Sequence, residues 1–425
     1  MNKKLTVIVI GAGNRGETYT DIMKKMPDKF EVVAVAEPIE SRRKNIQTKH
    51  NLPEEACFTT YDELFKLGKI ADMAIISTMD KQHFDPAMKA IALGYNLLLE
   101  KPVSPDPIEC EQIAQQAEKY SVKVVVCHVL RYTPFFMTLK QLILEGKVGE
   151  IVSINHEENV GNVHQSHSFV RGNWGNEARS ACMILAKSCH DVDILQWLLD
   201  KKCKKIQSFG SLTHFVRKNA PEGSAERCID GCPLAETCPY NAVKLYIDDK
   251  KNDWFRTTCA REANPTDEML EHALRTTQYG KCVYKCDNDV VDHQTVNMLF
   301  EDGITVTFSM NAFNKGGRFI HIMGTKGEIH GSMTSTDKPI QYFDFETRQT
   351  TEIPLRTGNG ILTGHGGGDT GIVNSIYEYF NGDDSNISIS DIRISVDNHH
   401  IAFAAEEARK QEIIIDFDKY VQSLQ

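Results

Sequence analysis

The chain has 425 residues, 12 of them cysteine, and a formal net charge of −10 at neutral pH. This length predicts two domains, the acidic charge argues against nucleic acid as a partner, and the lack of any apolar run of about 18 residues argues against a membrane span. The first apolar run ends in a glycine-rich loop rather than in a signal-peptide cleavage site. We therefore expect a cytoplasmic protein whose cysteines are thiols or metal ligands rather than disulfides.

A glycine-rich loop follows the first predicted strand. Residues 5–10 form an apolar, β-branched run, and residues 11–16 (GAGNRG) match G-x-G-x-x-G before a helix-compatible stretch. Gly11 permits the tight turn, Gly13 lets a pyrophosphate approach the backbone, and Gly16 lets the helix pack closely on the strand. The first N–H groups of the helix would face the phosphates. This context predicts a dinucleotide-binding site, against the alternative of a merely glycine-rich turn.

An acidic residue ends the second predicted strand. The apolar residues 31–36 lead into Glu37, which lies at the distance from the glycine loop that the motif requires, about 20 residues. A carboxylate there can accept the ribose hydroxyls and would repel a 2′-phosphate, so NAD is favoured. Arg42 and Arg43 follow closely and leave NADP possible.

Strand and helix patterns alternate up to about residue 130. The further strands are expected at residues 71–78, 95–100 and 122–128, and the helices at residues 84–93 and 108–120. Such alternation predicts a parallel sheet covered on both faces, here a Rossmann domain over residues 1–130. Ligands of such sheets bind at the carboxyl ends of the strands. Those ends carry Thr78, Met79, Glu100, Lys101 and His128.

The pattern changes after about residue 131. Longer strands are expected at residues 151–158, 206–215, 290–300, 304–312, 319–323, 328–333 and 340–345. Helices are expected at residues 135–144, 181–199, 372–380 and 390–411. The Asp302-Gly303 and Lys326-Gly327 pairs indicate hairpin turns. The fold class is thus α/β overall, with a second, α+β domain over residues 131–425 built on a mostly antiparallel sheet.

A cysteine-rich segment interrupts this second domain at about residues 215–290. Its thiols include Cys228, Cys232, Cys238 and Cys286, with a Cys-x3-Cys spacing at either end. Three or four thiolates that converge would suit a structural zinc ion. Free thiols and an iron–sulfur cluster are the alternatives, because the spacing matches neither a common zinc finger nor the usual ferredoxin pattern.

Four motifs in this order resemble the family of glucose–fructose oxidoreductase, inositol dehydrogenase and MocA (Gfo/Idh/MocA). They are the glycine loop at residues 11–16, Glu100-Lys101-Pro102, the stretch Ser188 to Asp193 with its histidine, and residues 395–410. The resemblance implies a nicotinamide-dependent oxidoreductase that acts on a sugar, polyol or sugar derivative. It also implies an open-faced sheet in the second domain and a homodimer or homotetramer.

The resemblance assigns catalysis to Lys101, His190 and Asp193. Oxidation of an alcohol by hydride transfer also requires a base for the hydroxyl proton. An imidazole titrates near neutrality, which suits His190, and the positive charge of Lys101 can hold the substrate oxygen and lower its pKa. The alternative for each residue is a purely structural role: Lys101 would be a surface lysine before a turn, and His190 a histidine of the core. The family often has an aspartate where this chain has Ala186.

The remaining candidate residues fall into two groups. The expected cofactor contacts are Gly11, Gly13, Asn14, Arg15, Gly16, Glu37, Thr78, Glu100 and Lys101. The expected substrate contacts are His128, Arg131, Trp174, Lys187, His365 and Asp369. The last two belong to a glycine-rich loop, residues 364–369, that resembles a loop of NAD-dependent glycosidases. This leaves two alternatives to a dehydrogenase: a lyase or glycosidase that recycles its NAD within each turnover, and a nucleotide-bound regulator or sensor.

Overall fold

A six-stranded parallel sheet forms the first part of the computed structural model, which describes residues 3–334, 339–355 and 365–424. The strands lie in the order β3-β2-β1-β4-β5-β6. They are β1 (Leu5–Ile10), β2 (Phe30–Ala36), β3 (Cys57–Phe58), β4 (Met73–Ile76), β5 (Asn96–Leu99) and β6 (Val124–Val126). The helices around this sheet are α1 (Asn14–Lys24), α2 (Glu40–His50), α3 (Tyr61–Phe65), α4 (Phe84–Ala92) and α5 (Pro107–Tyr120). The predicted Rossmann architecture is confirmed.

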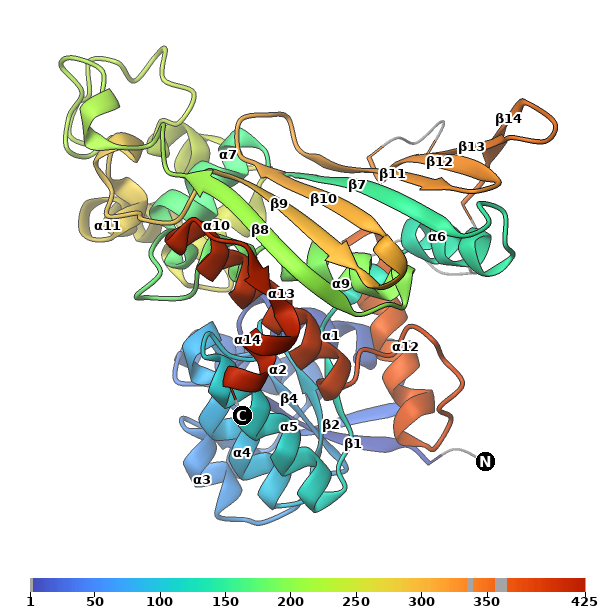
Figure 1. Ribbon diagram of the computed structural model, residues 1–425. Helices are drawn as coiled ribbons and strands as arrows, with labels where there is room; N and C mark the ends of the chain where they lie inside the picture. The colour runs from blue at the N-terminus through green and yellow to red at the C-terminus, as the bar shows by residue number, and fades with distance from the viewer. Residues whose placement is uncertain (1–2, 335–338, 356–364, 425) are drawn as a thin grey trace.

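The strands of this sheet form where the sequence places continuous apolar runs. Residues 7–10 and residues 73–76 are almost completely buried, because helices cover both faces of the sheet (Figure 1). The predicted first strand coincides with β1. The two-residue strand β3 was not predicted, because it is too short to give a periodic signal.

A nine-stranded sheet forms the second part, in the order β14-β13-β12-β11-β7-β10-β9-β8-β15. Its strands are β7 (Ile151–Asn159), β8 (Cys203–Ser211), β9 (His293–Phe300), β10 (Thr305–Asn311), β11 (Gly317–Gly324), β12 (Gly327–Ser332), β13 (Ile340–Asp344), β14 (Gln349–Ile353) and β15 (Ile415–Asp416). All neighbouring pairs are antiparallel except β7 with β10. The predicted, mostly antiparallel sheet is therefore confirmed.

Helices cover one face of the nine-stranded sheet. Figure 1 shows α6 (Pro134–Leu144), α9 (Cys189–Leu199) and α13 (Ile392–Gln411) against this face, and none of the described helices against the other. Alternate residues of β11 and β12 follow this division, since Ile320, Ile322 and Ile329 are buried while His321 and His330 are not. We call the uncovered side the open face.

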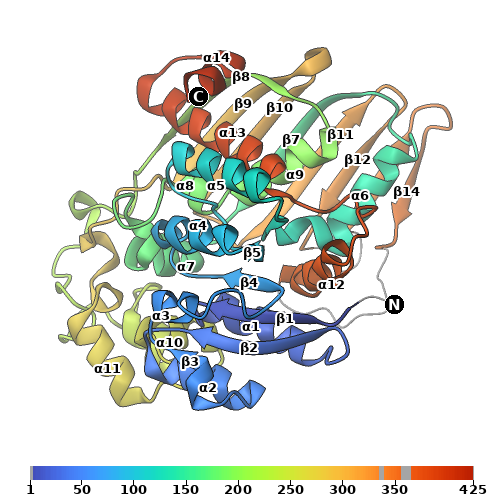
Figure 2. The same cartoon turned by 90° about the horizontal axis from the view of Figure 1, so that it is seen from below.

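The two sheets are joined by helices from the end of the chain. The helix α12 (Gly368–Phe380) packs beside α1, and its Ile372, Val373 and Ile376 join the apolar core of the first sheet (Figure 2). The helix α13 packs against both α5 and β8. The chain therefore returns to the Rossmann part after β14 and adds the edge strand β15 to the second sheet only afterwards. The domain boundary near residue 130 stays a prediction. None of the described helices combines the length and apolarity that a membrane crossing requires.

The segment between β8 and β9 forms a lobe with an apolar core of its own. Its helices include α10 (Asp253–Ala260) and α11 (Asp267–Thr276). Tyr246, Phe255, Leu270 and Leu274 form part of a buried cluster there. His167, outside this segment, stacks on Phe255 with ring centroids 4.0 Å apart. Aromatic packing therefore holds this lobe together.

Other short elements complete the fold. They are α7 (Asn162–His164), α8 (Met183–Ala186) and α14 (Phe417–Ser423). The single helix predicted at residues 181–199 is wrong, because the chain breaks at Lys187 and Ser188 into α8 and α9. The strand β14 was not predicted, since four of its five residues are polar and exposed.

Candidate functional site

The glycine loop between β1 and α1 has the geometry of a phosphate cradle. Gly11 has φ +87°, and a Cβ atom there would lie 2.7 Å from the Ser77 carbonyl oxygen. A Cβ on Gly16 would lie 2.2 Å from the Gly11 carbonyl oxygen. At Gly13 the nearest atom would be the side-chain nitrogen of Arg42, at 3.5 Å. The loop is therefore closed where the chain must pack and accessible at Gly13, where a ligand would approach.

The N-terminus of α1 has the features that a dinucleotide requires. No side chain caps this end of the helix, which begins at Asn14 after Gly13. Backbone N–H groups at an uncapped helix N-terminus can bind phosphate oxygens. The residues present therefore fit the pyrophosphate of a nicotinamide dinucleotide.

Glu37 lies next to this loop, at the carboxyl end of β2. Its carboxylate accepts hydrogen bonds from the backbone N–H groups of Ala12 (2.7 Å) and Ile39 (2.9 Å). Each oxygen keeps a lone pair for a ribose hydroxyl. Arg43 donates to the Glu37 carbonyl oxygen at 2.6 Å, and Arg42 lies beside Gly13. The site thus presents both a carboxylate and cations to the adenosine half of a nucleotide.

Glu100 organises the neighbouring edge of the first sheet. Its Oε1 accepts from Arg15 Nε and from the Tyr19 hydroxyl, each at 2.7 Å. Burial acts to raise the pKa of the Glu100 carboxyl, but the positive charges of Arg15 and Lys101 outweigh it and lower that pKa. Arg15 also forms an ion pair with Asp369 at 2.6 Å, at the start of α12. A residue of the glycine loop therefore binds the start of α12, which lies 354 residues later in the chain.

Lys101 points toward the break between α8 and α9. Its Nζ donates a hydrogen bond to the Ala186 carbonyl oxygen at 2.8 Å. In a continuous helix that carbonyl would accept from the backbone N–H four residues later, at His190. The interrupted helix therefore holds the lysine one turn before the histidine. The peptide bond between Lys101 and Pro102 is cis.

Three histidines lie in contact behind this lysine. The ring of His128 is 5.9 Å from that of His190 and 5.7 Å from that of His399, measured between centroids. Burial, together with the charges of Arg131 and Lys101, lowers the pKa of His128 well below its usual value. His190 keeps 7% of its surface exposed, whereas His128 and His399 are fully buried. The sequence places the first two here and did not indicate His399.

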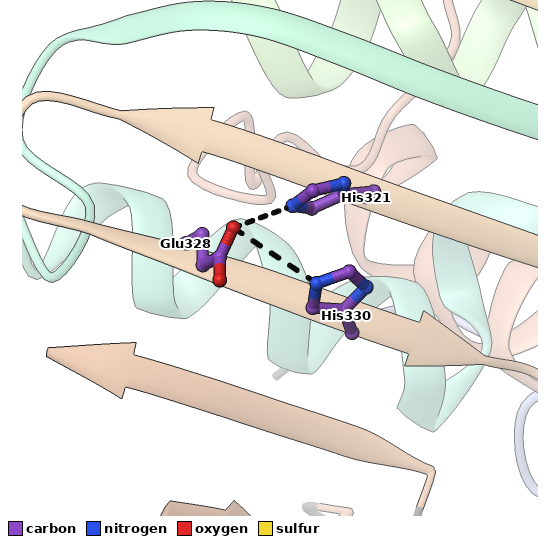
Figure 3. A group of neighbouring side chains, drawn as sticks. All are labelled: His321, Glu328 and His330. Carbon is purple, nitrogen blue, oxygen red and sulfur yellow. Dashed lines mark hydrogen bonds and ion pairs between the residues drawn. The ribbon is translucent and has the colours of Figure 1, made fainter. Parts of the chain in front are cut away.

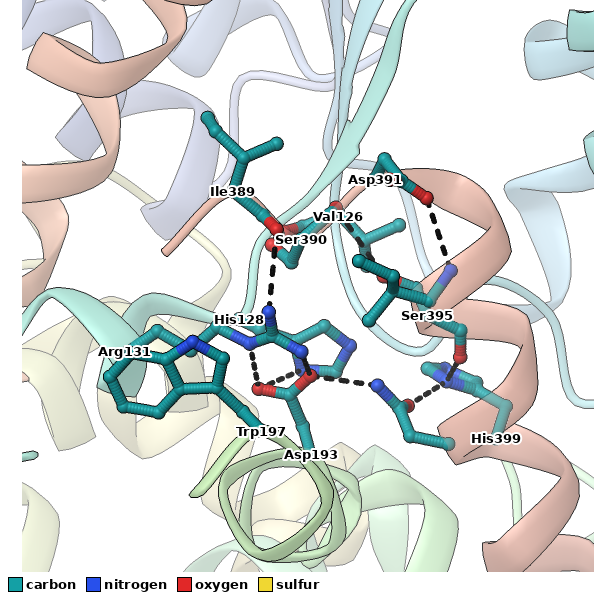
Figure 4. A network of polar contacts seen from close by, with 12 residues as sticks. Val126, His128, Arg131, Asp193, Trp197, Ile389, Ser390, Asp391, Ser395 and His399 are labelled. Carbon is teal, nitrogen blue, oxygen red and sulfur yellow. Dashed lines mark hydrogen bonds and ion pairs between the residues drawn. The ribbon is translucent and has the colours of Figure 1, made fainter. Parts of the chain in front are cut away.

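Asp193 and Arg131 are buried against each other (Figure 4). Arg131 donates from Nε and Nη2 to the two carboxylate oxygens of Asp193, at 2.8 and 2.6 Å. Asn398 of α13 donates to the same carboxylate at 2.7 Å. The expected catalytic role of Asp193 and the expected substrate role of Arg131 stay predictions, and the geometry gives both a positioning role.

A charged cluster lies beside His190 on the helix-covered face of the second sheet. Lys187 and Arg318 both contact the Glu158 carboxylate, at 3.1 and 2.7 Å. Arg318 also donates to Asp191 at 2.7 Å, and Asp191 is 2.9 Å from His156. Burial opposes ionisation of Asp191, but Arg318 and His156 lower its pKa. Only Lys187 of these was expected here, because the cluster depends on the pairing of β7 with β11.

The other expected substrate residues have separate positions. Trp174 donates from its indole N–H to Asp80 at 2.9 Å, which connects the second part to the loop after β4. Thr78, at the same edge, donates to the Gln82 carbonyl oxygen at 3.0 Å. Gly364 lies outside the described residues, and of His365 only the backbone is described.

The expected cysteine site is not supported. Within the described residues, Cys228, Cys232, Cys238 and Cys286 do not converge to within chelating distance of one another. Cys228 accepts a hydrogen bond from Arg171, and Cys286 donates one to the Cys282 carbonyl oxygen at 3.4 Å. The lobe instead has a buried apolar core of its own, which includes Tyr246 and Phe255.

The glycine loop of a Rossmann sheet and the edge residues Glu100-Lys101-Pro102 lie beside the helix that carries His190. Together these features define a class, the nicotinamide-dependent oxidoreductases with a separate second domain. Two family models give the particular family. One, described as oxidoreductase family, NAD-binding Rossmann fold, matches residues 5–128, and the other, described as oxidoreductase family, C-terminal alpha/beta domain, matches residues 140–391. The chain therefore belongs to the Gfo/Idh/MocA family of oxidoreductases, as predicted.

Individual relatives are distant. The chain is 23% identical to YteT of Bacillus subtilis strain 168 over 75% of its length and 74% of that protein. It is 27% identical to the inositol 2-dehydrogenase of Arthrobacter sp. strain FB24, over 52% of its length and 61% of that enzyme. The chain thus matches less than two thirds of this inositol dehydrogenase.

Solved structures share the fold across both parts. A scyllo-inositol dehydrogenase from Lactobacillus casei, with bound NAD(H) and scyllo-inositol, has a TM-score of 0.66 at 16% identity and covers 98% of this chain and 100% of its own. An Agrobacterium radiobacter oxidoreductase, in complex with NAD+, L-tartaric acid and magnesium, has a TM-score of 0.67 at 13% identity and covers 98% and 99%.

Proposed function

We propose that this protein is an NAD(P)-dependent dehydrogenase that oxidises a secondary alcohol of a sugar, polyol or sugar derivative, with NAD preferred. The observation that carries the proposal is the contact of Lys101 with Ala186, which holds an ammonium group beside the His190 helix at the cofactor edge of the first sheet. Inositol dehydrogenases among the relatives support a polyhydroxylated substrate.

The residues of the site would have the following roles. A nicotinamide dinucleotide, held through its pyrophosphate by the glycine loop, would supply the hydride acceptor. Lys101 would hold the reacting oxygen and stabilise its negative charge as the hydroxyl proton leaves. His190 would take that proton, because an imidazole nitrogen can act as a general base. Lys187, Glu158 and Arg318 would bind the remaining hydroxyl groups.

The alternatives receive less support. Asp369, proposed for a glycosidase-like loop, is bound to Arg15 beside the cofactor loop. A regulator that only binds nucleotide would not require Lys101 to lie beside the His190 helix at the cofactor-binding edge of the first sheet. The expected cytoplasmic location and homodimer or homotetramer stay predictions.

The test is formation of NADH by the full-length protein, followed by absorbance against a panel of polyols, sugars and sugar acids. We expect net reduction of NAD with at least one member, and its loss in His190→Ala. Product release without net NADH would favour the recycling enzyme. Tight nucleotide binding without turnover of any member would contradict the dehydrogenase.

A further inference from the structure

A second group of potential ligands lies on the open face, away from the cofactor edge. His321 of β11 lies directly opposite His330 of β12, and Glu328 precedes His330 by two residues. Side chains two residues apart on a strand share a face. All three side chains therefore project from the same side of the hairpin, as Figure 3 shows.

The three side chains converge on one carboxylate oxygen. Glu328 Oε2 is 2.8 Å from His321 Nε2 and 3.9 Å from His330 Nε2. One ligand atom from each residue can be chosen so that all three lie within 4.8 Å of one another. The two imidazole rings stack with their centroids 3.8 Å apart. The hairpin register alone is enough to bring the two rings together.

This donor set has the chemistry of a metal site. Neutral imidazole and carboxylate are ligands of first-row divalent metals, at bond lengths of about 2.0–2.2 Å. Two ligands of a tetrahedral ion at those lengths lie about 3.4 Å apart. The observed separations of 2.8 and 3.9 Å lie on either side of that value, so small side-chain rotations would close the site.

We propose that His321, Glu328 and His330 bind a divalent first-row transition-metal ion on the open face of the second sheet. Three protein ligands leave a coordination position for water or for an external group. Both histidines line an open depression of about 420 Å³, so an ion reaches them from solvent. In the part of the chain that the structure describes, this is the one group of three such ligands.

The site is separate from the proposed active site. Asn155 of β7 pairs with His321 and is exposed on the open face, whereas the next residue, His156, is buried on the helix-covered face beside Asp191. The sheet therefore lies between the two sites. A metal here would act on the open face and not on the hydride transfer.

The experiment is a cobalt titration of the full-length protein after treatment with a chelator and a thiol reductant. Co²⁺ reports its ligands by absorption, because thiolate ligation adds a charge-transfer band in the near ultraviolet that histidine and carboxylate do not. This separates the open-face site from any binding by the cysteines. The variants are His330→Gln and Glu328→Gln, with His272→Gln, an exposed histidine of α11, as the control.

We expect wild type and His272→Gln to bind one Co²⁺ without the thiolate band. Both open-face variants should bind Co²⁺ at least about tenfold more weakly. Mutation of a residue that merely hydrogen-bonds a metal ligand typically lowers metal affinity by that factor, and loss of a ligand itself should cost no less. Their melting temperatures should match wild type, because the side chains are solvent-accessible. The proposal fails if Co²⁺ binds only with the thiolate band, or if His330→Gln and Glu328→Gln bind as wild type does. Dehydrogenase activity plays no part in this readout.

Discussion

Arg131 and Asp193 form a buried, two-hydrogen-bond ion pair directly behind the proposed base, at 2.8 and 2.6 Å. Arg131 lies in the short helical turn η3 (Val129–Tyr132), which follows the first sheet, and Asp193 lies in α9. Asn398 adds α13 to the same contact. One carboxylate thus fixes the histidine helix relative to the Rossmann sheet, so we regard Asp193 as a positioning residue.

Asp193→Ala should therefore act mainly on stability. Removal of one partner leaves the Arg131 guanidinium buried without its counter-charge, which costs about 3–5 kcal/mol of unfolding free energy. The measurement is urea denaturation at neutral pH. Asp287→Ala is the matched control, because its ion pair with Arg179 is solvent-exposed and such pairs contribute about 0–1 kcal/mol. Equal losses in the two variants would refute the positioning role.

Lys101→Met should remove turnover and leave nucleotide binding in place. The substitution keeps an unbranched side chain that is one atom shorter but removes the charge proposed to stabilise the reacting oxygen, an effect of about 10²–10⁴ in kcat. Calorimetry of NAD binding and steady-state kinetics separate the two properties. Lys119→Met, at an exposed position of α5, is the control. A variant with an unchanged kcat would remove Lys101 from the chemistry.

Two glycines of the cofactor loop should respond differently to alanine. Gly11→Ala forces a positive φ on alanine and places its Cβ against the Ser77 backbone. The free energy of unfolding should therefore fall by about 1–3 kcal/mol from the φ strain alone, and the melting temperature should fall with it. Gly13→Ala has room in the protein and should melt as wild type does. Its methyl group lies where the pyrophosphate would approach, so NAD affinity should fall at least about tenfold. Unchanged NAD affinity in Gly13→Ala would mean that the pyrophosphate binds elsewhere.

The sequence predicts the first sheet well because its strands are continuous apolar runs. In a parallel sheet that is covered on both faces, most residues of a strand are buried, so the apolar run itself marks the strand. The glycine loop and Glu37 are recognised by their spacing and their neighbours in the chain, so the sequence also predicts these cofactor-binding residues. These local patterns account for the cofactor half of the site.

The substrate half could not be predicted in the same way. Glu158 and Arg318 meet because β7 pairs with β11, more than 150 residues later in the chain. Continuous periodicity at residues 181–199 favoured one helix, yet the interruption at Lys187 leaves the Ala186 carbonyl for Lys101. The hydrogen bond from Lys101 replaces a helical hydrogen bond there. Lys101 is distant in the sequence, so the local pattern cannot predict this replacement.

Glu37→Ser should shift the cofactor preference toward NADP. The substitution removes the carboxylate that would repel a 2′-phosphate, while Arg42 and Arg43 remain beside the site. We expect the ratio of kcat/KM for NAD over NADP to fall at least tenfold, about 1.4 kcal/mol. Glu40→Ser, an exposed change at the start of α2, should leave the ratio unchanged. A ratio that stays at the wild-type value in Glu37→Ser would place the adenosine ribose away from Glu37.

His399 connects α13 to the segment that follows Lys101. Its Nδ1 is 2.6 Å from the Ser395 carbonyl oxygen, which can only accept, so Nδ1 carries the proton. Its Nε2 accepts from the Val103 backbone N–H at 3.0 Å. The contact at Nε2 requires the neutral ring, because a protonated imidazole has no acceptor nitrogen. Burial, with the nearby His128, accordingly lowers the pKa of His399 to about 3.

This lowered pKa makes the folded state sensitive to acid. An unfolded chain binds the proton below about pH 6.5, whereas the folded protein does so only near pH 3. The unfolded state thus holds more protons in this window, and the free energy of unfolding falls as the pH decreases from about 6.5 toward 3. His399→Gln, whose amide can keep both hydrogen bonds without titrating, should lose less stability than wild type between pH 7 and pH 5 in urea denaturation. His272→Gln should behave as wild type does, and an equal loss in all three proteins would assign the acid sensitivity to other groups.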